Sequence, residues 1–71
     1  MTNTELLKEK IDKSGYRITF LAEKTGMTPQ GFYKKLKDGS EWTYSQVKIL
    51  SDLLCLTKKE TDYIFFNLKV E

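Results

Sequence analysis

The sequence has little of the chemistry on which most enzymes and metal sites depend. It contains no histidine and a single cysteine, Cys55. Thiol–imidazole catalysis and a soft-metal site both need side chains that the sequence does not contain, and no disulfide can form within one chain. The acidic residues are scattered without an evident catalytic pair. We expect a protein that is not an enzyme and that has no metal site and no cofactor.

Long apolar runs are also missing. No stretch approaches the ~18 apolar residues that a membrane-spanning helix needs, and the N-terminal residues MTNTELLKEK are too polar for a signal peptide. With only one cysteine, the chain is predicted to be a cytoplasmic protein without a membrane partner. Its 71 residues, 39% of them hydrophobic, are enough for one domain spanning residues 1–71.

Positive charge is concentrated in one segment, although the net charge of the chain is only +2. Residues 17–37 contain five basic residues and one acidic residue, which gives the segment a charge of +4. The rest of the chain has seven basic and nine acidic residues and carries −2. The basic residues of the segment are Arg17, Lys24, Lys34, Lys35 and Lys37. This distribution is typical of a surface that contacts a polyanion.

Start and stop signals divide the first third of the chain into helices. Thr2 and Glu5 have the spacing of a capping box, and Gly15 is suited to end the helix that follows. Apolar residues at helical spacing predict a second helix over residues 18–25, which Gly26 closes.

A third helix is predicted directly after this glycine. Thr28 is its N-cap candidate, Pro29 suits the first helical position, and the helix should run to about Lys37. A helical wheel places Phe32 and Leu36 on one side together with Pro29, as a buried stripe.

Two capping boxes predict two further helices in the last third of the chain. Thr43 pairs with Gln46, and Thr57 pairs with Glu60 in a helix that should end near Leu68. No segment shows the alternation that is typical of a strand. The predicted fold is therefore all-α, a single domain of five short helices.

Trp42 and Cys55 each allow a functional and a structural interpretation. The indole N–H of Trp42 could donate to a phosphate, but its position before the Thr43 cap favours a hydrophobic staple with Val47. Cys55 lies among leucines, which predicts a small buried side chain and not a nucleophile.

The outward face of the third helix suits a DNA major groove. Gln30, Lys34 and Lys37 share this face, Tyr33 borders it on one flank, and Gly31 and Lys35 border it on the other. Gln can make paired hydrogen bonds to adenine, and Lys can donate to guanine or to phosphate. A glycine at position 31 would let the helix lie close to a neighbouring backbone. The alternative is a solvated helix face without a ligand.

These residues resemble the helix-turn-helix of Cro and repressor proteins from temperate phages, the XRE-type family. The residues that carry the likeness are Leu21, Ala22, Gly26, Met27, Thr28 and Phe32. The likeness extends over the whole chain, since that family has five helices with the motif on the second and third. It also includes the later pattern that begins at Trp42 and ends in Ile64-Phe65-Phe66. The resemblance implies a compact lambda-repressor-like domain.

The resemblance also implies contacts at the positions that match. Those on the third helix, to bases or phosphates, are Thr28, Gln30, Tyr33, Lys34 and Lys37. Thr19, near the start of the second helix, matches a phosphate contact. Where many relatives begin this helix with a capping Thr followed by Gln, the chain has Arg17-Ile18.

The C-terminal residues DYIFFNLKV are more apolar than one helix face can bury. Ile64 and Leu68 can face the core, which leaves Tyr63, Phe65 or Phe66 partly exposed. An exposed aromatic patch usually marks an interface. The alternative, that the first helix covers these rings, is equally open.

The resemblance implies a sequence-specific transcriptional regulator of a temperate phage or prophage, a Cro-like repressor. Its partner would be a double-stranded DNA operator, bound as a homodimer on half-sites about 34 Å apart. The alternative is a modulator or antirepressor that binds the cognate phage repressor and has little affinity for DNA alone. The low net charge and the residues Arg17-Ile18 favour this alternative.

Overall fold

Five α-helices make up residues 2–66, the part of the chain that this computed structural model describes, and that part contains no strand. They are α1 (Thr4–Ser14), α2 (Ile18–Lys24), α3 (Pro29–Asp38), α4 (Tyr44–Leu53) and α5 (Lys58–Phe66). The all-α, five-helix prediction is confirmed. None of these helices is long and apolar enough to cross a membrane.

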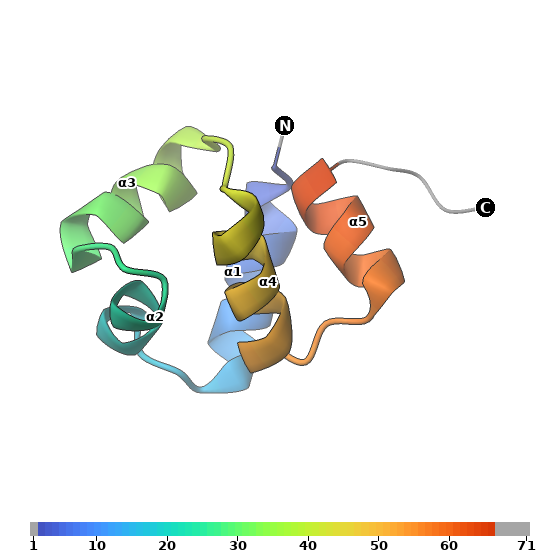
Figure 1. Cartoon of the computed structure of the whole chain (residues 1–71), viewed down its shortest axis with the longest axis horizontal. Helices are drawn as coiled ribbons and strands as arrows, with labels where there is room; N and C mark the ends of the chain where they lie inside the picture. The colour runs from blue at the N-terminus through green and yellow to red at the C-terminus, as the bar shows by residue number, and fades with distance from the viewer. Residues whose placement is uncertain (1, 67–71) are drawn as a thin grey trace.

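The helices α1 and α4 occupy the middle of the molecule (Figure 1). The α2–α3 pair lies at one end and α5 lies at the other. α1 contacts both α3 and α5, while α2 packs mainly on α3 and α4 packs on α5. Because α3 and α5 lie at opposite ends, a partner bound along one of them leaves the other accessible.

Every helix contributes to a single core. The buried apolar residues are Leu7, Ile11, Leu21, Ala22, Phe32, Leu36, Trp42, Val47, Leu50, Ile64 and Phe65. Three of their rings form a chain across the molecule. The Phe32 ring meets the Trp42 ring edge-on with centroids 5.1 Å apart, and Trp42 meets Phe65 in the same way at 6.3 Å. Trp42, in the α3–α4 loop, thus joins α3 to α5.

The predicted buried stripe of α3 is confirmed for two residues and wrong for the third. Phe32 and Leu36 are buried, but Pro29 is exposed. Pro29 occupies the first position of the helix, and its ring closes onto its own backbone, so the side chain has no reach toward the core.

The predicted capping box of Thr2 with Glu5 is wrong. Asn3 is the N-cap of α1, and its side-chain oxygen accepts a hydrogen bond from the Leu6 N–H at 3.2 Å. The Asn3 N–H itself donates to the Ile64 carbonyl at 2.6 Å. This bond to α5 fixes how the chain approaches α1, so the helix begins at Thr4. Gly15 ends it in the left-handed conformation, as predicted.

The predicted threonine caps of the last three helices are confirmed. The Thr28 hydroxyl accepts the Gly31 N–H at 3.1 Å. Thr43 and Gln46 form a complete capping box, and so do Thr57 and Glu60. The predicted end of the last helix near Leu68 falls outside the described residues.

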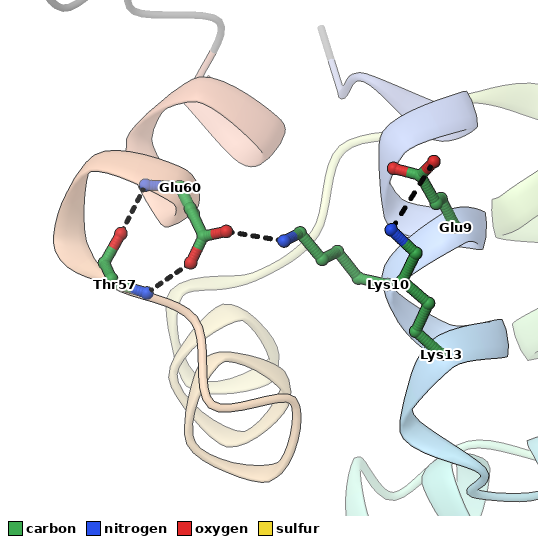
Figure 2. Close-up of polar contacts among 5 residues, drawn as sticks. All are labelled: Glu9, Lys10, Lys13, Thr57 and Glu60. Carbon is green, nitrogen blue, oxygen red and sulfur yellow. Dashed lines mark hydrogen bonds and ion pairs between the residues drawn. The ribbon is translucent and has the colours of Figure 1, made fainter.

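An ion pair holds α1 against α5 (Figure 2). The Lys10 ammonium lies 2.5 Å from one carboxylate oxygen of Glu60, and the other oxygen accepts the Thr57 N–H at 2.9 Å. The hydrogen bond from Lys10, followed by the one from Thr57, holds the pKa of Glu60 below its ordinary value. The second pair in the figure, Glu9 with Lys13, is an exposed contact of 3.9 Å within α1 and contributes little to stability.

Cys55 is exposed, and the prediction of a buried side chain is wrong. It follows α4 with a φ of +55°, and it is the only non-glycine residue with a positive φ in the described part of the chain. The Cys55 N–H donates to the Asp52 carbonyl at 3.3 Å, and the Leu56 N–H donates to the Ser51 carbonyl at 2.9 Å. This is the Schellman motif, in which glycine is the usual residue at the left-handed position. The turn therefore directs the thiol outward, whatever the apolar character of its neighbours.

Replacing Cys55 with glycine should raise the free energy of unfolding by about 0.5–1 kcal/mol. A residue with a Cβ pays about 1–2 kcal/mol for the left-handed conformation in the folded state, and glycine avoids this cost. Glycine also stabilises the unfolded chain by about 0.4–1 kcal/mol through its greater conformational freedom, and this offsets part of the gain. Urea unfolding of wild type, Cys55→Gly and Cys55→Ala measures the effect. Alanine keeps the Cβ and should match wild type, so equal stability of the glycine and alanine variants would contradict the strain at this position.

Candidate nucleic-acid interface

A tight turn joins α2 to α3. The Met27 N–H donates to the Ala22 carbonyl at 2.8 Å, and the Gly26 N–H donates to the Glu23 carbonyl at 3.1 Å. These two bonds form a second Schellman motif, here with glycine at the left-handed position, where φ is +75°. The hydroxyl of the buried Thr25 donates to the Leu21 carbonyl at 2.8 Å and so closes the end of α2. The turn ends at Thr28, whose side chain caps α3.

The structure brings five of the six predicted DNA contacts to the outer side of α3. All five are exposed: Thr28, Gln30, Tyr33, Lys34 and Lys37. Gln30 and Lys34 lie opposite the buried Phe32 and Leu36, and Tyr33 borders that side. Tyr33 is the most exposed ring of this helix, at 58%. The sixth, Thr19, is exposed in the first turn of α2.

Lys35 does not belong to this outer face. Its ammonium donates to the backbone carbonyl of Glu41 at 2.5 Å and lies 5.3 Å from the centre of the Trp42 ring. The side chain therefore folds back over the α3–α4 loop and stabilises it. Helical spacing alone could not reveal this role, because the position of the loop depends on the packing of Trp42.

The lysines of the outer face carry charge that no acid of the described residues neutralises. Within residues 2–66 the ion pairs lie on α1 and α5, and none of them includes Lys34 or Lys37. The first turn of α3 also has no acidic residue. This face therefore presents unpaired positive charge beside an amide and a phenol, which suits an anionic ligand with hydrogen-bonding edges.

One acidic residue lies at the edge of the outer face. A groove of about 490 Å³ between α1 and α3 has Tyr33 and Lys37 on one side and Asp12 with Lys8 on the other. Its apolar lining includes Leu36. The Asp12 carboxylate offsets part of the positive charge that Lys8 and Lys37 bring to this groove, whereas Lys34 does not line it.

The predicted aromatic interface on the last helix is partly wrong. Phe65 is only 3% exposed, because it packs against Trp42 in the core. Tyr63 and Phe66 are exposed, but they lie in different places. Tyr63 lines a groove with Leu6 of α1, whereas Phe66 lines one with residues of α4. The two exposed rings thus line separate grooves.

Sequence reasoning missed Tyr44, which is 77% exposed in the first turn of α4. It lines a groove of about 260 Å³ between α4 and α5 together with Lys48, Asp62 and Phe66. We call these four residues the α4–α5 surface. A helical wheel could have found it, since Tyr44, Val47 and Lys48, at i, i+3 and i+4, share one face of α4 and all line this groove.

Comparisons with protein-family models, with curated proteins and with solved structures gave no match to this chain.

Proposed function

We propose that this protein is a sequence-specific DNA-binding regulator of the Cro-like type found in temperate phages. The observation that carries the proposal is the outer face of α3, where Gln30, Tyr33 and Lys34 are exposed and the lysines are unpaired among the described residues. The tight turn after α2 supports it, because a helix held this way at one end of a small domain is available to a DNA groove (Figure 1).

In this proposal α3 lies in the major groove of an operator. Gln30 and Lys34 contact base edges, and Tyr33 and Lys37 contact the DNA backbone together with Thr28. Thr19, in the first turn of α2, adds a phosphate contact across the groove. The site of action is the cytoplasm, where phage operators are found.

Such regulators usually bind as dimers to half-sites about one DNA turn, ~34 Å, apart. The α4–α5 surface is the proposed contact between two copies, because it carries two exposed aromatic rings and includes no residue of α3. Sedimentation equilibrium of wild type and of a Tyr44→Ser, Phe66→Ser double variant tests this contact. If the wild type stays monomeric at every concentration, with DNA and without it, the proposed contact between two copies is excluded.

The second candidate function is that of a modulator or antirepressor that binds a repressor protein. The exposed rings of the α4–α5 surface favour it, since they could equally bind a different chain. Affinity for DNA in the absence of any partner separates the two functions.

The experiment is a selection of genomic fragments from the source organism by the purified protein at low and at moderate salt. A direct regulator should enrich one intergenic region. Its logarithmic affinity should fall with the logarithm of salt concentration by roughly 0.9 for each phosphate contacted. If no fragment is enriched at either salt, the autonomous regulator is excluded. The same selection is then repeated with the candidate repressor added.

A further inference from the structure

Gly31 is a glycine that the fold does not require. It is the third residue of α3 and is not among the glycines with positive φ, so its backbone conformation is open to any residue. A Cβ at this position would meet one atom within 4 Å, the side-chain oxygen of Thr28 at 3.1 Å. No backbone atom from elsewhere in the described residues approaches it. The neighbouring backbone that glycine was expected to accommodate is therefore not part of the described fold.

The Thr28 cap does not explain the glycine either. The same cap begins α4 and α5, where the third residues are Gln46 and Glu60. Their N–H groups donate to the capping threonine at 3.2 and 3.1 Å, as Gly31 does at 3.1 Å. The chain thus contains this cap twice with a long side chain at the third position.

Glycine at position 31 also removes a stabilising bond. In α4 the Gln46 side chain accepts the N–H of Thr43 at 2.9 Å, and in α5 Glu60 does the same for Thr57. Gly31 cannot make this return bond to Thr28. Since glycine is also one of the least favourable residues in a helix, two separate effects favour another residue here.

The position of Gly31 points to a ligand outside the chain. It directly follows Gln30 in the chain and precedes Lys34 by three residues, so Gly31 and Lys34 are neighbours on the helix surface. We propose that Gly31 is the point of closest approach between α3 and DNA, where the absence of a side chain lets the helix backbone lie directly against the groove. This inference rests on the proposed function and adds a positioning residue to it.

The test compares stability with DNA affinity in two variants, Gly31→Ala and Gly31→Gln. Glutamine can restore the return bond to the Thr28 N–H, so this variant should unfold at a higher urea concentration than wild type. Both variants should nevertheless bind the selected operator about tenfold more weakly or worse, with glutamine the weaker, because the added atoms hold the helix away from the groove. Opposite changes in stability and affinity would support the proposal.

Ser45→Ala is the control, since it changes an exposed residue in the first turn of α4, away from the proposed site. It should leave the operator affinity unchanged. If both Gly31 variants bind as tightly as wild type while wild type selects an operator, the close approach is excluded and the proposed function stands. A loss of stability in both variants would also overturn the inference, because the fold would then need the glycine. If wild type selects no DNA, the proposed function and this inference fail together.

Discussion

Replacing Phe32 with alanine is expected to remove about half of the stability of this domain, or more. The Phe32 side chain is fully buried, and its ring meets Trp42, which in turn meets Phe65. Truncating a buried phenylalanine to alanine costs about 3–5 kcal/mol through lost apolar burial and the cavity left behind. A domain of this length has a total free energy of unfolding of roughly 4–11 kcal/mol. The change should also loosen the contact of α3 with the rest of the protein.

Urea unfolding followed by circular dichroism measures this loss. Tyr33→Ala is the matched control, since it truncates the neighbouring ring on the exposed side of the same helix. Its effect should stay within about 0.5 kcal/mol. Phe32→Leu should remain folded and lose about 1–2 kcal/mol. A loss below about 1 kcal/mol for Phe32→Ala would show that the ring contacts of Phe32 with Trp42, and of Trp42 with Phe65, do not hold α3 in place.

Removing Gln30 and Lys34 together is expected to weaken binding to the selected operator by roughly 100-fold or more. A side chain that reads a base contributes about 1–3 kcal/mol of discrimination, and a charged hydrogen bond adds about 1.5–3 kcal/mol. Both residues are exposed and make no ion pair among the described residues, so their loss should leave the fold intact. Fluorescence anisotropy with the Gln30→Ala, Lys34→Ala double variant measures the effect.

Single variants separate base reading from contact with the DNA backbone. Gln30→Ala should reduce discrimination between the operator and altered operators, with little change in the salt dependence. Lys37→Ala, which removes a proposed contact to the DNA backbone, should lower the slope of logarithmic affinity against logarithmic salt by roughly 0.9. Lys13→Ala removes the same charge from an exposed position on α1 and should have little effect. Wild-type affinity in the double variant would exclude α3 as the reading helix.

Most of what the sequence predicted correctly depends on residues that are close together in the chain. The threonine caps at Thr28, Thr43 and Thr57 need only a partner three residues away, and Gly15 and Gly26 need only a left-handed turn. The outward position of Gln30 and Lys34 follows in the same way from helical geometry once Phe32 is buried. Local patterns of this kind are therefore sufficient to predict the five helices and the composition of the candidate site.

The predictions at Pro29 and Cys55 failed for local reasons, but the other incorrect predictions concern residues whose surroundings depend on how separate elements pack. Phe65 is buried because Trp42, 23 positions earlier, packs against it, and Asn3 caps α1 because its N–H is bound to the Ile64 carbonyl. In the same way, Lys35 folds back over the α3–α4 loop and leaves the outer face. The sequence by itself determined the helices, most of their caps and the charge of α3, because each depends on interactions over a few residues. Only the tertiary structure decided which aromatic rings are buried and which lysines of α3 stay on its outer face, because those depend on how the helices pack.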